Sequence, residues 1–104
     1  MPTPTLPSNA VRRALRKLGA DIKDARRRRK LTTTVVAERA FTTRKSLQRV
    51  EQGDFAVSSG IYASVLLALG MLERLADLAD PATDELGLAL SAADLPQRVR
   101  TPKR

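Results

Sequence analysis

Apolar residues recur along most of the chain at intervals of three and four, which is the spacing that predicts amphipathic helices. The first stripe follows Ser8 and Asn9, either of which can cap a helix that begins at Ala10. Its members are Leu15, Leu18, Ile22 and Ala25. Gly19 interrupts this stripe and costs a helix about 1 kcal/mol relative to alanine, so a bend or break is an open alternative there.

Two shorter apolar runs follow, and each comes directly after a threonine. Their apolar positions are Val35, Val36, Ala37 and Ala40 in the first run, and Leu47 and Val50 in the second. Thr32 and Thr43 suit these places because a hydroxyl can accept a hydrogen bond from the free N–H groups of a first helical turn. Only Phe41 and Thr42 separate the runs, and Gly53 stands where a left-handed C-cap is expected. The pattern is typical of a helix–turn–helix.

The helical periodicity continues after residue 53. Phe55 and Val57 lie in a loop and are expected to close the core from outside. Ser58 or Ser59 can cap a further helix that ends near Gly70. Its apolar positions are Ile61, Val65, Leu66 and Leu69.

The last third of the chain is rich in leucine. An amphipathic helix is predicted over 71–79, and Asp80 and Pro81 form a pair typical of a helix start. Leucines at 86, 88 and 90 fit a helix or a short strand within 84–92, and the surrounding Ala, Glu and Leu favour the helix. Since no segment requires a sheet, the predicted fold is all-α with five or six helices.

Charge divides the chain into unequal parts. The 104 residues carry a net charge of +8, and residues 12–30 alone hold ten Lys and Arg against two Asp. Residues 71–95 hold one Arg against six acids, and residues 96–104 are basic again. A basic N-terminal part with an acidic segment at 71–95 suits a protein that presents one end to a polyanion. A run of charges alone, however, more often marks a solvated helix face.

Composition excludes several kinds of chemistry. The chain has no cysteine and no histidine, which rules out disulfides, thiolate or imidazole metal sites, and Cys–His or Ser–His nucleophile pairs. No glycine-rich phosphate loop is present either, so no catalytic residue, metal or cofactor is expected. No apolar run approaches the roughly 20 residues of a membrane span, and the N-terminus lacks the features of a signal peptide. We therefore expect a cytoplasmic protein.

These patterns suggest four segments. They are a proline-rich arm at 1–9, a helix–turn–helix domain at 10–70, a helical dimerisation or partner segment at 71–95, and a basic tail at 96–104. One domain of this size covers only a half-site on DNA, so specificity normally requires a two-fold dimer and an inverted repeat.

Residues 18–70 resemble the lambda-repressor-like, XRE-type helix–turn–helix domains. The resemblance is carried by Leu31-Thr32, VAERA at 36–40, Thr43-Arg44 and Leu47-x-Arg49-Val50-Glu51-x-Gly53. It implies a helical bundle whose third helix, here about 43–52, enters the major groove. Position 41 is often glycine in that family, whereas this chain has Phe41, which suggests a different or longer turn.

The resemblance also implies roles for individual residues. The side chains expected to face the bases are Arg44, Lys45, Ser46 and Arg49. Phosphate contacts are expected from Thr33, Thr43, Gln48, Gln52, Arg28 and Lys30, with a shorter threonine at 33 where the family often has glutamine. Arg26 and Glu51 match a structural salt bridge between the first helix and the end of the recognition helix.

Residues beyond about 49 look like the Hip-type antitoxins, which repress their own promoter as dimers and hold a kinase-like toxin. The expected dimer or partner surface consists of Met71, Leu72, Leu75, Leu78, Leu86 and Leu90. For Leu75 and Leu78, a place in the monomer's own core is an equal alternative. Two other functions stay open: a stand-alone repressor without a toxin, and a protein–protein adaptor that binds nucleic acid only weakly.

Overall fold

The structure is a computed structural model that describes residues 7–100, with side chains described up to residue 93. Its helices are α1 (Asn9–Arg28), α2 (Thr33–Arg39), α3 (Arg44–Glu51), α4 (Ser59–Ala68), α5 (Leu72–Ala76), the 3-10 helix η1 (Pro81–Thr83) and α6 (Glu85–Arg100). No strand occurs in these residues, so the predicted all-α class is confirmed. Residues 85–92, for which a strand was the alternative, are helical.

A hydroxyl group caps each of the first four helices. The four hydrogen bonds run from Val11 N to Ser8 Oγ (3.2 Å), Val35 N to Thr32 Oγ1 (3.1 Å), Ser46 N to Thr43 Oγ1 (3.0 Å) and Ile61 N to Ser58 Oγ (3.2 Å). Each bond satisfies one N–H group that a first helical turn leaves free. The predicted cap positions are therefore confirmed, and the alternatives are resolved in favour of Ser8 and Ser58.

A residue in the left-handed conformation follows the end of each of these four helices. The residues with positive φ are Lys30 (56°), Phe41 (55°), Gly53 (73°) and Gly70 (78°). After α2, for example, Phe41 N donates to Glu38 O at 3.1 Å and Thr42 N donates to Ala37 O at 2.9 Å. This pair of bonds is the Schellman motif, which favours glycine at its left-handed position. Phe41 thus takes a glycine-like backbone conformation, while its side chain is 97% exposed.

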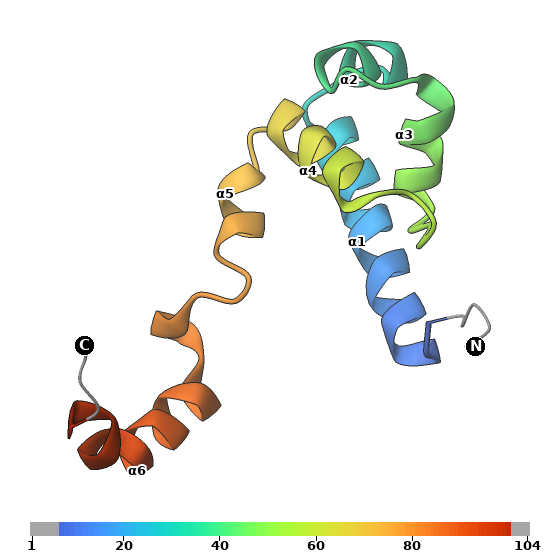
Figure 1. Cartoon of the computed structure of the whole chain (residues 1–104). Helices are drawn as coiled ribbons and strands as arrows, with labels where there is room; N and C mark the ends of the chain where they lie inside the picture. Colours follow the sequence, from blue (N-terminus) through green and yellow to red (C-terminus); the bar gives the residue numbers. More distant parts are fainter. Residues whose placement is uncertain (1–6, 101–104) are drawn as a thin grey trace.

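The core lies where α1, α2, α3 and α4 meet (Figure 1). Helix α3 packs against α1, α2 and α4, and α5 packs against α4. The buried residues are Ile22, Ala25, Val36, Ala37, Ala40, Leu47, Val50, Tyr62, Val65, Leu66 and Leu69. The apolar stripes read from the sequence supply ten of these eleven positions, since only Tyr62 lies outside them.

Two glycines let α1 and the end of α3 approach closely. Helix α1 is continuous through Gly19, so no break occurs there. A Cβ atom at Gly19 would lie 2.5 Å from the carbonyl oxygen of Val50, and one at Gly53 would overlap the Leu15 carbonyl. A side chain at position 19 would not fit where the two helices cross. Glycine therefore suits this position despite its unfavourable helix propensity.

The region after residue 70 differs from the prediction in its boundaries. Helix α5 is shorter than the helix expected over 71–79 and ends at Ala76. It ends where its packing ends, because Leu75 packs against the core whereas Leu78 is 76% exposed. Asp80 and Pro81 do start a helix, but only the three-residue η1, and Asp84 Oδ1 then accepts from Gly87 N to begin α6.

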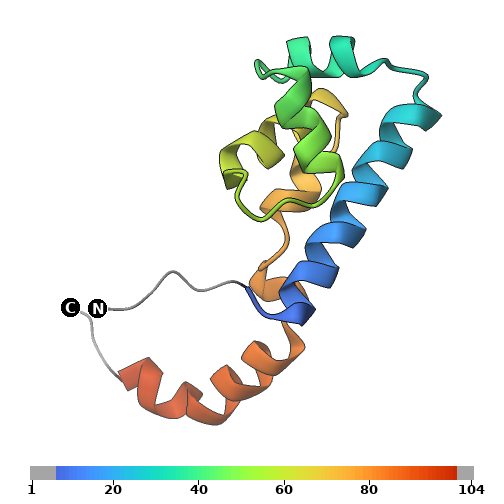
Figure 2. The ribbon, with the colours of Figure 1, turned by 90° about the vertical axis from the view of Figure 1, so that its right-hand side faces the viewer.

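Helix α6 stands apart from the core. Figures 1 and 2 show it at the far end of an arm that leads away from α4 through α5 and η1. The radius of gyration is 18.4 Å, compared with about 13 Å for a compact chain of this length. Helix α6 runs through Pro96 to Arg100, so the predicted tail at 96–104 begins inside a helix.

Parts of the predicted arm and tail, residues 1–6 and 101–104, lie outside the described residues. Among the helices of the described part, none is both long enough and apolar enough to cross a bilayer.

Candidate nucleic-acid interface

Helix α3 has one buried side and one exposed side. Leu47 and Val50 are fully buried against the core. The exposed side carries Arg44, Lys45, Gln48 and Gln52, which combine two cations with two amides. Positions 44, 48 and 52 follow one another at intervals of four and therefore line up along the helix. The fold thus presents a row of hydrogen-bond donors to the solvent.

A shallow hollow next to this row contains no acidic residue. It measures about 490 Å³ and is lined by Thr33 of α2 together with Arg44, Lys45 and Gln48 of α3. Two segments that are separate in sequence therefore join their polar side chains at one place. Thr33, for which a phosphate contact is expected, thus lies beside the exposed side of α3.

A second hollow extends the same surface onto α1. It measures about 260 Å³ and shares Thr33 and Gln48 with the first. Its other lining residues are Glu51 and Gln52 at the end of α3, and Lys23, Arg26 and Arg27 of α1. Lys23 and Arg27 are not among the contact residues expected from the sequence. The sequence does contain information that points to them. The match of Arg26 to Glu51 indicates which side of α1 faces α3, and Lys23 and Arg27 lie three residues before and one residue after Arg26.

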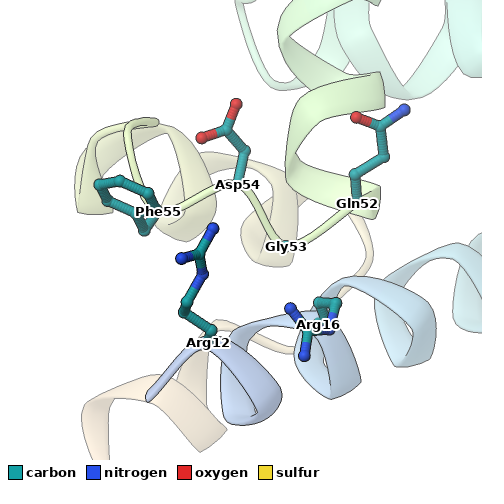
Figure 3. A pocket seen from close by; sticks show the side chains of 6 residues that line it. All are labelled: Arg12, Arg16, Gln52, Gly53, Asp54 and Phe55. Atoms are coloured by element: carbon teal, nitrogen blue, oxygen red, sulfur yellow. The ribbon is translucent and has the colours of Figure 1, made fainter. Parts of the chain in front are cut away.

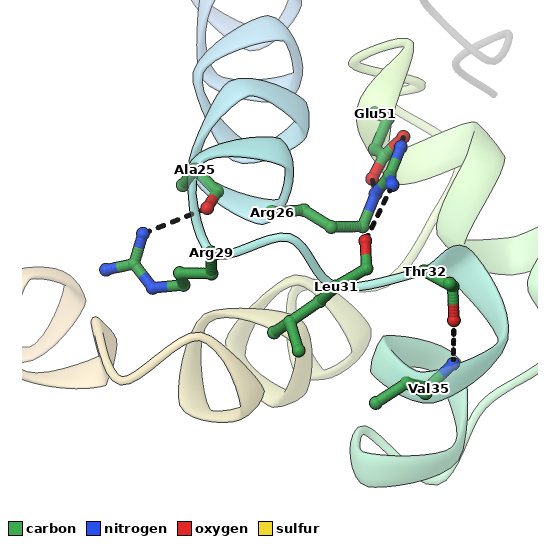
Figure 4. A network of polar contacts seen from close by, with 7 residues as sticks. All are labelled: Ala25, Arg26, Arg29, Leu31, Thr32, Val35 and Glu51. Atoms are coloured by element: carbon green, nitrogen blue, oxygen red, sulfur yellow. Dashed lines mark hydrogen bonds and ion pairs between the residues drawn. The ribbon is translucent and has the colours of Figure 1, made fainter.

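An ion pair between Arg26 and Glu51, which both line the second hollow, joins α1 to α3 (Figure 4). Arg26 Nε donates to Glu51 Oε2 at 2.7 Å, and Arg26 Nη2 donates to Glu51 Oε1 at 3.2 Å. A third bond runs from Arg26 Nη1 to the Leu31 carbonyl at 3.1 Å. The two side chains are only 11% and 7% exposed. Glu51 is therefore neutralised by a protein cation before any polyanion approaches α3.

Arg49 lies at the edge of the exposed side rather than in its row. Its Nε donates to Asp54 Oδ2 at 2.8 Å, and the side chain is 42% exposed. This bond, followed by one from the Ala56 N–H, holds the pKa of Asp54 below its ordinary value of 3.8. A base contact by Arg49 would require this surface pair to open, and exposed ion pairs contribute little to stability.

The loop after α3 is held in place by Asp54 and Tyr62. The Tyr62 hydroxyl donates to the Asp54 carbonyl at 2.9 Å. Burial, and then the nearby Asp54 charge, raise the pKa of Tyr62 above its ordinary value of 10.0. The loop therefore anchors the C-terminal end of α3 to α4.

Four of the proposed contact residues lie elsewhere. Ser46 is half-buried and two residues from Gln48, so it projects from the other side of α3. Thr43 lies at the start of α3, and its hydroxyl already accepts the capping bond. Arg28 pairs with Asp24 on α1, and Lys30 is the exposed left-handed residue that follows this helix. Neither Arg28 nor Lys30 lines the two hollows.

A third hollow continues the basic surface toward the start of α1. It measures about 250 Å³ and is lined by Arg12, Arg16, Gln52, Gly53, Asp54 and Phe55 (Figure 3). The guanidinium of Arg12 lies 5.8 Å from the centre of the Phe55 ring, within the range of a cation–π contact. Gln52 lines both this hollow and the previous one, so the three hollows form one continuous band.

The residues proposed for a dimer or partner surface fall into two groups. Met71 and Leu75 pack against the core, and Leu72 is half-buried. Leu78, Leu86 and Leu90 are exposed by 76%, 71% and 58%. For Leu75 the alternative of a place in the monomer's own core is therefore the one observed, whereas Leu78 is outside it.

No group of three or more Asp and Glu side chains comes together as a metal site within residues 7–93. Comparisons of the chain with protein-family models, with curated proteins and with solved structures found no match.

Proposed function

We propose that this protein binds double-stranded DNA sequence-specifically and represses transcription, with α3 as the recognition helix of a lambda-repressor-like helix–turn–helix. The observation that carries the proposal is the acid-free hollow formed by Thr33, Arg44, Lys45 and Gln48. It joins an exposed row of donors on one helix to the beginning of the helix before it. A short helix with such a row fits the major groove, which is about 12 Å wide.

The roles of the side chains follow from their chemistry. Arg44 can donate two hydrogen bonds to guanine O6 and N7, and Gln48 can pair with adenine N6 and N7. Each good bidentate pair contributes about 1–3 kcal/mol of discrimination between bases. Thr33, Lys23 and Arg27 lie beside the row and suit phosphate oxygens, which would fix the position of the helix on the duplex.

We further propose that the protein acts as a homodimer and as the antitoxin of a kinase-like toxin, and that it represses its own promoter. This part rests on the resemblance of the second half of the chain and on its acidic character. A stand-alone repressor is the main alternative. An adaptor function is favoured by one observation, the exposed leucines of α6.

The test is a pair of double variants with equal loss of charge. Arg44→Ala/Lys45→Ala removes the two cations on the exposed side of α3, whereas Arg13→Ala/Lys17→Ala removes two exposed cations of α1. Lys17 lies two residues from Gly19, the point where α1 meets α3, and so projects from the other side of α1. Affinity for the DNA upstream of the gene is then measured by fluorescence anisotropy.

The proposal predicts that the first variant loses at least about 100-fold in affinity for its operator, as expected for the loss of one or two base contacts. The second should lose only the smaller, non-specific electrostatic part. Equal losses in both variants would show that net charge, and not the α3 surface, determines binding. For the antitoxin role, co-purification of a kinase-like protein encoded in the same operon is expected, and its absence would leave the stand-alone repressor.

A further inference from the structure

The core domain has an uncovered apolar groove between α1, α5 and the loop before α4. Two adjoining hollows of about 350 and 390 Å³ form it, and they share Leu18, Leu75 and Leu78. Met71 lines one hollow and Phe55 the other. Leu78 lies between them and is 76% exposed. The groove is therefore a large apolar surface that the described residues of one protomer leave open to solvent.

Helix α6 is the second uncovered apolar surface. In residues 85–93 only Glu85 and Ser91 are polar. Leu86 and Leu90 share one side of the helix, whereas Leu88, which is 50% exposed, lies on the opposite side. A helix that is apolar on both sides is normally buried between two surfaces. Here it stands at the end of the arm, with η1 as its main neighbour.

We propose that α6 of one protomer docks through Leu86 and Leu90 into this groove on a second copy of the chain, and that the second copy does the same in return. Such an exchange about a two-fold axis covers the groove and one side of α6 in both protomers at once. The other side of α6, with Leu88, then faces the α6 of the second copy across the axis. If α6 instead folded back onto its own groove, Leu88 would stay exposed.

Charge supports this pairing. The start of α6 carries Asp84 and Glu85, and residues 85–93 contain no Lys or Arg. The groove is flanked by Arg74 at one end and by Arg12, over the Phe55 ring, at the other. Asp21 also lines the groove, but its carboxylate is paired with Lys17 at 2.7 Å. Within residues 7–93 neither Arg12 nor Arg74 forms an ion pair, so both are available to the acidic end of the helix.

The inference deepens the homodimer that the proposed function includes, and it rests on that part of it. It names the surfaces that form the dimer, and its test measures association in the absence of DNA. A chain that stays monomeric but still protects DNA would overturn this inference alone. A chain that dimerises through α6 but binds no DNA would overturn only the recognition-helix assignment.

The first experiment is sedimentation velocity on the full chain over a range of concentrations. Leu86→Asp/Leu90→Asp changes the docking side of α6, and Leu78→Asp changes the groove at a residue outside the core. Leu67→Asp is the matched control, because Leu67 is 61% exposed on α4 and lines neither hollow. Circular dichroism verifies that each variant remains folded.

The wild type and Leu67→Asp should be dimers. The double variant should raise the dissociation constant by at least about 100-fold, because each of the two protomers loses two leucines that docking would bury. Leu78→Asp should raise it by about tenfold or more. A monomeric wild type, intact dimers in the α6 and groove variants, or dissociation of the control to the same extent would each overturn the proposal.

Disulfide cross-linking distinguishes exchange between chains from folding back within one chain. The sequence has no cysteine, so single cysteines can be introduced without interference. Two differently tagged chains, one with Leu78→Cys and one with Leu90→Cys, should form a mixed disulfide on mild oxidation. Leu67→Cys should not cross-link to Leu90→Cys. If Leu78→Cys/Leu90→Cys in one chain forms only an internal disulfide, and the mixture forms none, the exchange is disproved.

Discussion

The Arg26–Glu51 pair offers a quantitative test of how α3 is held. Glu51→Gln keeps the size of the side chain and removes its charge. The Arg26 guanidinium then keeps its bond to the Leu31 carbonyl but loses a carboxylate that receives two of its N–H groups at 2.7 and 3.2 Å. Since the two side chains are 11% and 7% exposed, little water can replace the lost charge.

Removing one partner of a buried pair costs about 3–5 kcal/mol. We expect a value near the lower end, about 3 kcal/mol, because the glutamine oxygen can still accept one hydrogen bond. For a domain of this size, such a loss lowers the melting temperature by roughly 12–24 °C. Arg26→Met/Glu51→Met should be less destabilised than the sum of its single variants, because no charge is left buried alone.

Urea unfolding followed by far-UV circular dichroism measures the free energy. The matched control is Asp21→Asn, which also turns a carboxylate into an amide. It breaks an exposed pair, because the side chains of Lys17 and Asp21 are 79% and 59% exposed. That change should cost no more than about 0.5 kcal/mol. If Glu51→Gln is no more destabilising than Asp21→Asn, the Arg26–Glu51 pair does not hold α3 in place.

Three other predictions concern the backbone and the loop after α3. Gly19→Ala should lower the free energy of unfolding by about 1–3 kcal/mol, because the added Cβ would meet the backbone of α3. Gly60→Ala is the control: its Cβ would make ordinary contacts only, so the change should be neutral or stabilising in the same urea assay. Phe41→Gly should stabilise by about 0.5–1 kcal/mol by relieving a left-handed conformation, and Phe41→Ala should not; equal effects would contradict this cause. The pKa of Asp54 is lower in the folded state, so its pair with Arg49 contributes stability above about pH 4 that is lost as the pH falls further. Asp54→Asn should therefore flatten the acid side of the stability curve, and an unchanged slope would argue against the pair.

Local chemistry made much of the fold predictable. A hydroxyl before an apolar run determines where a helix starts, and the four caps from Ser8 to Ser58 form as that rule requires. The positions of Gly53 and Gly70 were predictable for the same kind of reason, since a left-handed residue after a helix favours glycine. These effects depend on neighbouring residues, which a sequence displays directly.

Features that depend on distant segments were not predictable in the same way. Gly19 reads as a weak point in a helix until the backbone of α3 is placed against it. The Arg49–Asp54 pair joins residues only five apart, but it depends on the path of the loop after α3, which the apolar periodicity does not reveal. The leucines of α6 resemble a core segment in sequence, and only their position at the end of an arm shows that one protomer does not cover them.

We propose that Arg44, Lys45 and Gln48 of α3 read DNA. Footprinting on the gene's own upstream region can show this, with the wild type beside Arg44→Ala/Lys45→Ala and the charge-matched Arg13→Ala/Lys17→Ala. We predict protection of an inverted repeat whose half-sites are one helical turn, about 10 base pairs, or a multiple of it apart. The protection should vanish in the first variant and persist in the second. Absence of any protected site, or a footprint that the first variant leaves unchanged, would contradict the claim.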